Sequence, residues 1–353
     1  MITMKEIGRL AGVSQPAVSM ILNGRAREFN LSAETAERVW RIVRENGFHP
    51  NLLARSMRTG RTGIVGILVS TEWMQQIAGD YGNGGIAMRL QAGFLLAGCR
   101  VMLETVSVED CRTLKMPELL SSGLAEFMVV AQNFADEAAG QRYLENLYRQ
   151  FGKLVLVDDI VADSKIPSVT IDNVQAGRNA ADFLWRLGHR SFGTLCSECC
   201  RLAHQERLTA FGTRLAELSG GKTKVVSAFA GDRWQLDCGG IAVGRLLEMT
   251  DGSLPSAIFA TNDFFAYGAE LELLRRGIRI PEEVSLLGVG EWPTAAAAPV
   301  PITVVAMDTD EKIKLILRLW RQYQAGQTPE QNDFRLRGRL CKRQSTGKVR
   351  KKT

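Results

Sequence analysis

Helix start and stop signals crowd the first 22 residues of the chain. Thr3 stands three residues before Glu6, which is the spacing of a capping box. Gly12 follows as a residue that can take the left-handed conformation on which helices end. Ser14 can cap a second helix with Pro16 in its first turn, where a missing N–H costs little. Two short helices joined by a glycine-containing turn predict a helix-turn-helix motif, and an ordinary helical hairpin fits the same signals.

Apolar residues recur at helical spacing in this region and give each helix one inner face. Ser32 can cap a third helix, which ends at Gly47. Residues 51–60 are short and basic, so they fit either a separate small helix or a disordered linker. The predicted inner faces comprise Ile7, Leu10 and Ala11, then Val18, Ile21 and Leu22, then Ala36, Val39, Trp40 and Val43.

The overall composition describes a globular protein of two or three domains. The chain has 353 residues, of which 45% are hydrophobic and 23% are charged. No run of about 18 apolar residues predicts a membrane helix, and charges interrupt the N-terminus where a signal peptide needs an apolar core. Seven unevenly spaced cysteines favour reduced thiols. We therefore expect a cytoplasmic protein without a membrane partner.

The net charge of +6 is divided unevenly along the chain. Residues 1–62 carry +5 and residues 335–353 carry +9, which leaves −8 on residues 63–334. An acidic body with basic ends suggests that the ends contact a polyanion such as DNA. For residues 348–352, a solubilising disordered tail is an equally good interpretation.

Beyond Gly63 short apolar runs alternate with amphipathic helices. Buried strands that alternate with helices predict doubly wound parallel sheets. Two such series predict two α/β lobes, with a ligand cleft between the carboxyl ends of their strands. The expected strands are 64–69, 101–105, 127–131, 154–157, 169–171, 192–196, 225–229, 257–260 and 284–289, followed by a last long helix at 309–323.

Residues spread over nearly the whole chain match the motifs of one protein family. Near the N-terminus they are Ile7, Leu10 to Ser14, Val18, Ser19, Leu22 to Gly24, Glu34, Thr35, Arg38, Val39, Gly47, Phe48, Pro50, Asn51 and Ala54 to Ser56. In the body they include Asp172, Asn173, Leu187 to Arg190, Ala260 to Asp263, Ile280 to Ser285 and Ser345 to Gly347. With these residues at these spacings, the chain resembles the lac/gal repressor family of bacterial transcription regulators.

This resemblance implies a fold class, a set of domains and a function. The fold class is a small all-α helix-turn-helix domain plus an α/β two-lobed core similar to periplasmic sugar-binding proteins. The implied function is a sequence-specific repressor that binds a pseudo-palindromic operator in the nucleoid as a homodimer, controlled by a small, sugar-like effector in the cleft. The implied domains are 1–50 (helix-turn-helix), 51–62 (hinge), 63–340 (core, with lobe 1 at 63–162 plus 293–324 and lobe 2 at 163–292 plus 325–340) and 341–353 (basic tail).

The start of the second helix is expected to face base edges of the operator DNA. Only Gln15 there can read a base by a bidentate pair, and adenine is its best match. Pro16 lacks a side-chain donor, and Met20 offers apolar contact to thymine methyls unless it packs inward. By resemblance, Met57 stands where the family inserts an apolar wedge into the minor groove. The expected DNA-binding residues are Thr3, Ser14, Gln15, Pro16, Ala17, Ser19, Met20, Asn23 and Arg25, and in the hinge Asn51, Ala54, Arg55, Met57 and Arg58.

The resemblance also places an effector site in the cleft. A guanidinium and an amide can bracket hydroxyl groups or a carboxylate, and an indole can stack on a sugar ring. Gly290 stands where relatives often carry an aspartate, so one of the next two residues is expected to replace its contact. The expected effector-binding residues are Arg207, Trp234, Asn262, Glu291, Trp292 and Trp73.

Two other functions fit part of the sequence. A solute-binding protein would share the core, but it would carry an export signal in place of residues 1–62. A thiol or metal enzyme would use Cys196, Cys199 and Cys200, with His204 as a fourth ligand. No second spaced pair of ligands supports a metal site, so no metal, cofactor or catalytic residue is predicted. His189 follows a glycine before a strand and is expected to be structural.

Overall fold

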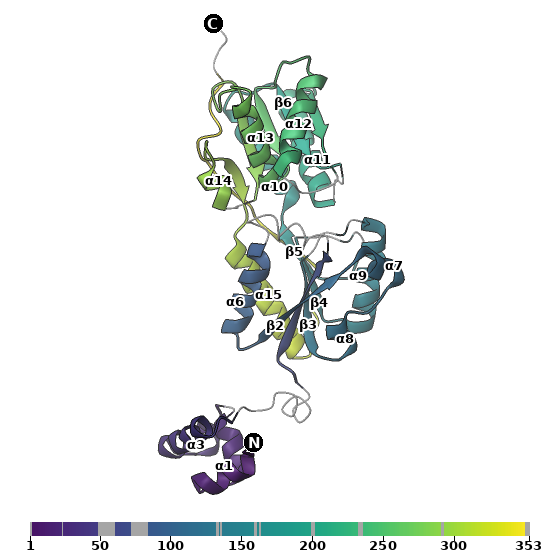
Figure 1. Ribbon diagram of the computed structural model, residues 1–353. Helices are drawn as coiled ribbons and strands as arrows, with labels where there is room; N and C mark the ends of the chain where they lie inside the picture. Colours follow the sequence, from purple (N-terminus) through teal and green to yellow (C-terminus); the bar gives the residue numbers. More distant parts are fainter. Residues whose placement is uncertain are drawn as a thin grey trace. The chain divides into compact units, whose positions relative to one another are not determined.

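The computed structural model describes residues 2–22, 24–48, 61–71, 84–131, 134, 136–158, 161, 164–198, 202–231, 236–290 and 293–349. The chain divides into two compact units, 1–63 and 64–353 (Figure 1). The first unit is all-α and the second is α/β, which confirms the predicted fold class. Within the described ranges, no helix is both long and apolar enough to cross a bilayer.

Short helices build the N-terminal unit. They are α1 (Met4–Ala11), α2 (Gln15–Leu22), the 3-10 turn η1 (Arg27–Phe29) and α3 (Ala33–Glu45). The predicted capping box is confirmed, because the Thr3 hydroxyl accepts the Glu6 N–H at 3.2 Å and the Glu6 carboxylate accepts the Thr3 N–H at 2.8 Å. Gly12 ends α1 with a φ of 65°. The shared core comprises Ile7, Ala11, Val18, Ile21, Val39, Ile42 and Val43.

Two of the predicted inner residues lie at the surface. Leu10 is 49% exposed and Trp40 is 36% exposed. Each helix offers the core a narrow stripe of residues three or four apart, such as Ile7 with Ala11, Val18 with Ile21 and Val39 with Val43. Leu10 directly precedes Ala11, and Trp40 directly follows Val39. Adjacent residues of a helix point about 100° apart around its axis, so these two side chains point away from the core. The expectation that they face inward is therefore wrong.

Lobe 1 of the second unit is a parallel sheet with helices on both faces. Its strands are β1 (Ile64–Ser70), β2 (Arg100–Val106), β3 (Ala125–Val130), β4 (Leu154–Val157), β5 (Ser168–Ile171) and β11 (Asp333–Leu336). Its helices are α6 (Gly84–Leu96), α7 (Val108–Thr113), α8 (Glu118–Ser121), α9 (Glu137–Phe151) and α15 (Thr309–Gln324). The strand order is β11-β5-β4-β3-β1-β2. Helices α6 and α15 pack on one face of the sheet, and α7, α8 and α9 pack on the other (Figure 1).

Lobe 2 repeats this arrangement with one antiparallel edge. Its strands are β6 (Phe192–Cys196), β7 (Val225–Phe229), β8 (Ala257–Ala260), β9 (Ser285–Val289), β10 (Thr303–Ala306) and β12 (Arg339–Cys341). Its helices are α10 (Asn173–Arg186), α11 (Leu202–Ser219), α12 (Leu236–Met249), α13 (Asp263–Arg275) and α14 (Pro293–Ala297). The strand order is β12-β10-β9-β8-β6-β7, and only β12 runs antiparallel to its neighbour. Helices α10 and α11 pack on one face, and α12 and α13 on the other.

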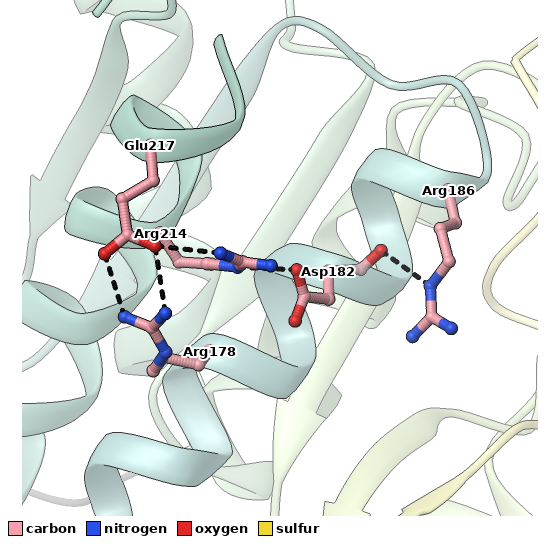
Figure 2. Close-up of polar contacts among 5 residues, drawn as sticks. All are labelled: Arg178, Asp182, Arg186, Arg214 and Glu217. Carbon is pink, nitrogen blue, oxygen red and sulfur yellow. Dashed lines mark hydrogen bonds and ion pairs between the residues drawn. The ribbon is translucent and has the colours of Figure 1, made fainter. Parts of the chain in front are cut away.

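Ion pairs join α10 to α11 on the outer surface of lobe 2 (Figure 2). Arg178 donates to both carboxylate oxygens of Glu217, at 3.0 and 2.9 Å. Arg214 lies between two acids and donates to Asp182 at 2.7 Å and to Glu217 at 2.8 Å. Arg186 donates to the backbone carbonyl of Asp182 at 3.1 Å. These contacts hold the two helices together on the side exposed to solvent.

The chain crosses between the lobes in three places, which corrects the predicted lobe boundaries. Strand β5 belongs to lobe 1, although the sequence places residues 163–292 in lobe 2. Strand β10 belongs to lobe 2 and β11 to lobe 1, which is the reverse of the prediction. Strand assignment depends on pairing between distant segments, and no local pattern encodes that pairing.

Gly338 lies where these three crossings meet. A Cβ on Gly338 would lie 2.8 Å from Ile171 and 2.7 Å from Val305, which belong to the other two crossings. Leu336 accepts the backbone N–H of Asp172 at 2.7 Å, so the first and third crossings are also joined by hydrogen bonds. The three connections therefore form one packed hinge between the lobes.

The first nine residues of the predicted C-terminal tail are folded onto lobe 2. Ser345 is fully buried, and its hydroxyl accepts the Thr303 N–H at 2.8 Å. The backbone N–H of Val349 donates to Leu187 at 3.1 Å. Residues 341–349 are therefore part of lobe 2 and not of a separate basic tail as predicted, because small hydroxyl side chains satisfy the backbone of a buried segment that has few apolar residues. Residues 350–353 lie outside the described residues.

Candidate nucleic-acid interface and effector cleft

The first turn of α2 presents polar and small side chains to solvent. Ser14, Gln15 and Pro16 are exposed, and the Ser14 hydroxyl accepts the Ala17 N–H at 3.3 Å as a cap. Met20 is partly exposed and is absent from the core of the unit. Ala17 and Ser19 are likewise partly exposed. The core residues of α2 therefore anchor the helix and leave its predicted reading surface uncovered.

Arg25 lies in an exposed cluster in the loop between α2 and α3. Its guanidinium pairs with Glu28 at 2.7 Å and lies over the ring of Phe29 at 5.2 Å. Phe29 is 46% exposed, so the loop holds Arg25 without packing that ring into the core. Thr3, which is the N-cap residue of α1, is exposed. Asn23, Asn51, Ala54, Arg55, Met57 and Arg58 lie outside the described residues.

In lobe 2, Arg207 is held at the carboxyl ends of the strands. It lies in α11, and only 8% of the residue is exposed. Its Nε donates to the Asn173 side-chain oxygen at 2.8 Å, and its Nη1 donates to the Thr261 carbonyl at 2.6 Å. Burial lowers the pKa of Arg207 to about 10, so the guanidinium still carries its charge at neutral pH. The Arg207 side chain is therefore a buried cation whose guanidinium is held in one orientation by these two hydrogen bonds.

Asn262 lies next to the carbonyl that Arg207 contacts. Its side-chain oxygen accepts the Phe265 N–H at 2.7 Å and so caps α13. Its buried Nδ2 has no hydrogen-bond partner among the described residues. A buried amide donor without a partner is costly, so it is suited to receive an acceptor atom from a ligand. The structure therefore brings together two of the residues that the resemblance assigned to the effector.

Asp263 was missed by the sequence reasoning and fills the space beside Gly290. Gly290 has a φ of 122°, a conformation that other residues rarely adopt. A Cβ there would lie 2.4 Å from a carboxylate oxygen of Asp263. A carboxylate is thus present at the position where the sequence lacks the family's aspartate, but it comes from the first turn of α13. The signal was available, because Asp263 directly follows the expected ligand Asn262.

Lobe 1 contributes an ion pair at the carboxyl end of β4. Lys312 has 2% of its side chain exposed, and its Nζ donates to both carboxylate oxygens of Asp158 at 2.5 Å. The charge of Asp158 also acts on Arg207 of lobe 2 and favours its protonated form. Asp158 and Arg207 therefore interact across the lobe boundary. Trp73, Trp234, Glu291 and Trp292 lie outside the described residues.

The contacts of Cys196 and His204 fit structural roles. Cys196 is buried at the end of β6. His204 lies in α11, and its Nδ1 is 3.1 Å from the Thr261 hydroxyl. No group of metal-ligating side chains occurs among the residues that the structure describes, and Cys199 and Cys200 fall outside them. His189 is buried between the Ser256 hydroxyl and the Gly347 carbonyl, both at 3.0 Å, as expected for a structural histidine.

Comparison with known proteins adds full-length relatives. CelR of Thermobifida fusca is 28% identical over 346 residues, which cover 97% of this chain and 98% of CelR. AscG of Escherichia coli (strain K12) is 27% identical over 338 residues, or 90% of each protein. Both are named HTH-type transcriptional regulators and not enzymes.

Solved structures share the fold. The lac repressor dimer bound to operator and the anti-inducer ONPF matches with a TM-score of 0.78 at 19% identity, over 98% of this chain and 99% of that one. A CelR–cellobiose complex matches with a TM-score of 0.67 at 24% identity, over 98% of this chain and 100% of that one.

Family motifs cover both units. Residues 181–346 match the periplasmic binding protein-like domain, and residues 3–51 match the bacterial regulatory proteins of the lacI family. A helix-turn-helix unit, a two-lobed core and relatives that match from end to end agree with one another. The chain thus carries the helix-turn-helix domain of the lacI family of bacterial regulatory proteins and, behind it, a periplasmic binding protein-like domain.

Proposed function

We propose that this chain is a repressor that binds a pseudo-palindromic operator as a homodimer and is controlled by a small hydroxylated effector. The proposal rests on one observation, that a single chain contains both a surface suited to DNA and polar groups suited to a small ligand. One unit exposes the first turn of α2, and the other holds Arg207 beside the unpartnered amide of Asn262. Chromosomal DNA as the partner would place its action in the bacterial cytoplasm.

The proposed reading surface is poor in hydrogen-bond donors. Gln15 is the one side chain in the exposed first turn of α2 suited to a bidentate contact, and adenine is its best partner. Pro16 and the partly exposed Met20 offer only apolar contact, for which thymine methyls are the match. We infer that this regulator depends on methyl contacts, phosphate contacts and DNA deformability more than on guanine-reading arginines.

The proposed effector contacts follow from the polarity of the cleft. Arg207 and the Nδ2 of Asn262 are donors, and Asp263 adds acceptor oxygens nearby. Donors and acceptors that converge on one region suit hydroxyl groups, each of which can both donate and accept. The relative CelR has been solved with cellobiose, which supports a carbohydrate as the first class to test.

The proposed dimer surface includes the outer side of lobe 1. Met88 and Leu95 in α6 are 71% and 67% exposed and lie seven residues apart, on the same face of the helix. Met102 and Leu103 on the edge strand β2 are 42% and 46% exposed. Exposed apolar side chains gathered on one edge of a lobe are typical of a protein–protein interface. We infer that a second copy covers them.

Selection of duplexes from a random pool, followed by titration at physiological salt, tests this function. We expect A·T-rich half-sites related by two-fold symmetry and a preference of about 1000-fold or more over random DNA. Gln15→Ala should lose about 1–3 kcal/mol of operator binding and relax one adenine position in each half-site. Gln141→Ala in α9 is the control and should bind as the parent does. Binding without sequence preference would overturn the proposal.

A further inference from the structure

A chain of hydrogen bonds leads from lobe 1 to the cleft arginine. It begins at Arg335 in β11, whose Nε donates to Asp333 in the same strand at 2.8 Å. The Nη1 of Arg335 donates across the lobe boundary to Glu206 in α11, also at 2.8 Å. Glu206 directly precedes Arg207. We propose that the Arg335–Glu206 pair is an inter-lobe latch that positions Arg207 in the cleft.

Asn173 connects the latch to the guanidinium. Glu206 accepts a hydrogen bond from the Nδ2 of Asn173 at 3.3 Å, and the Oδ1 of Asn173 accepts the Nε–H of Arg207 at 2.8 Å. Asn173 is fully buried, so its amide cannot turn to water if one of these contacts is lost. The carboxylate of Glu206 attracts the amide nitrogen and thereby directs the amide oxygen at Arg207. Removing Glu206 from this place removes what orients Asn173.

The latch spans the hinge between the lobes. Asn173 comes immediately after the first crossing and Arg335 lies just before the third. These crossings are joined by the Asp172–Leu336 backbone contact and by the Gly338 N–H, which donates to the Gln175 side chain at 2.9 Å. Arg335 belongs to the sheet of lobe 1 and Glu206 to a helix of lobe 2. A rotation about the hinge therefore changes the distance between them.

The packing of α10 on α11 keeps the rest of the relay rigid. A Cβ on Gly177 would lie 2.4 Å from the carbonyl oxygen of Arg207, so the two helix backbones are in close contact there. Asn173 lies one turn before Gly177 on the same face of α10. The relay thus has two stiff links within lobe 2 and one link, Arg335 to Glu206, that depends on the lobe arrangement.

Burial strengthens this ion pair relative to those on the surface. The side chains of Arg335 and Glu206 are 26% and 20% exposed, whereas those of Arg178 in α10 and Glu217 in α11, on the outer surface, are 40% and 41% exposed. Water and salt screen a partly buried pair less. Asp333 adds a second carboxylate to Arg335, and the two acids raise the pKa of Arg335 above its ordinary value.

The inference rests on the proposed role of the cleft as the effector site, and its test needs neither operator nor effector. The variants are Arg335→Gln, which removes the charge, and Arg335→Lys, which keeps it. Arg178→Gln is the matched control, because it removes an arginine–glutamate pair between the same helix and another element (Figure 2). All are made in the full-length chain, and thermal unfolding reports whether each is folded.

Two measurements report on the latch. Nitrogen-15 NMR of the arginine Nε–H groups, assigned through Arg207→Lys, gives the rate at which the Arg207 proton exchanges with water. Single-molecule energy transfer gives the distance between dyes at the exposed Gln141 of lobe 1 and Lys222 of lobe 2. The dyes are attached through p-acetylphenylalanine, with one labelled chain per dimer.

We expect Arg335→Gln to speed the Arg207 exchange about tenfold, the size expected for losing a charge-assisted contact, and to broaden or shift the interdye distance. Arg335→Lys should restore most of the slow exchange, and Arg178→Gln should leave both readouts at the parent values. Unchanged exchange and distance in Arg335→Gln would overturn the latch. So would equal effects in Arg178→Gln, because these would reflect general loosening of the fold. Failure of operator selection would overturn the proposed function while leaving these measurements valid.

Discussion

Single residues in this protein decide how closely the elements around Arg207 can pack. Gly177 allows α10 and α11 to approach at Arg207, and Gly290 leaves room for the carboxylate of Asp263. Glu270 is a different case, since its carboxylate is fully buried in lobe 2 and one of its oxygens has no partner among the described residues. Each position supports a prediction that depends on one side chain.

Gly177→Ala should destabilise the core. The added Cβ would lie 2.4 Å from a backbone oxygen, which cannot move without shifting a helix. Overpacking of this kind costs about 1–3 kcal/mol. Gly212→Ala in α11 is the control, because nothing lies within 4 Å of its Cβ position, and the better helix propensity of alanine should add about 0.5–1 kcal/mol. Urea unfolding of both variants measures the difference, and a loss of similar size in both would contradict the packing argument.

The stability of the core should fall as pH rises from about 5 to about 8. Burial raises the pKa of Glu270 to about 7, although the Val300 N–H it accepts at 2.5 Å opposes this. The folded state therefore keeps a proton that the unfolded chain releases near pH 4.5, so unfolding is increasingly favoured between these values.

Glu270→Gln should remove this dependence, a difference of roughly 2.5 kcal/mol between pH 5 and pH 8. Glu248→Gln, at an exposed position in the neighbouring helix α12, should keep the slope of the parent. Urea unfolding at the two pH values provides the comparison. Parallel curves for the parent and Glu270→Gln would show that the buried carboxyl titrates normally.

The bounds of some helices and strands are set by local sequence signals, and those of others are set by contacts with distant segments. The helix α1 begins at a capping box and ends at a left-handed glycine, so its bounds are set within its own sequence. The strand β12, by contrast, is only three residues long and exists because it pairs with β10. The segment after it is held by hydroxyl contacts such as Ser345 to Thr303.

Thr3→Ala should loosen α1 at its start. The change removes the hydroxyl that accepts the Glu6 N–H, and losing such a cap costs about 1 kcal/mol. Hydrogen exchange of peptides covering residues 2–11 should speed up about fivefold if local opening governs it. Thr3→Ser keeps the hydroxyl and should exchange like the parent. An alanine variant that exchanges at the parent rate would mean that tertiary contacts alone hold the helix.

At the scale of the whole molecule, the two units differ in what they bury and in what they expose to solvent. The N-terminal unit must leave the start of α2 uncovered, and it does so with a core of few residues. The second unit buries charged groups such as Arg207 and Lys312, and it exposes apolar side chains on α6 and β2, which we propose as the dimer surface.

Met88→Asp should weaken dimerisation. A carboxylate in the centre of a covered apolar surface is costly to desolvate, so the dimer dissociation constant should rise about 10–100-fold. Leu114→Asp is the control, because Leu114 is 41% exposed at the end of α7, a helix on the other face of the lobe 1 sheet, and has a φ of 56° that aspartate tolerates. Sedimentation velocity over a concentration series measures both. Unchanged association in Met88→Asp would place the interface elsewhere.

Much of this protein could be predicted from local sequence. The caps of α1 and α3, the alternation of strands and helices and the last long helix depend on hydrogen bonds and side-chain periodicity within a few residues. The motif residues of the N-terminal unit were recognisable from short patterns with fixed spacing, and the assignment of Arg207 and Asn262 to the effector came from the resemblance to a known family.

Only the tertiary structure decided which sheet β5, β10 and β11 join, how Asp263 comes to lie beside Gly290, and that Arg335 reaches Glu206. These outcomes bring together residues that are far apart in the sequence, such as Glu206 and Arg335, which are 129 positions apart. Which residues pair depends on three-dimensional packing and on how the lobes meet at their hinge. The local sequence around one residue of such a pair does not indicate which distant residue it will contact.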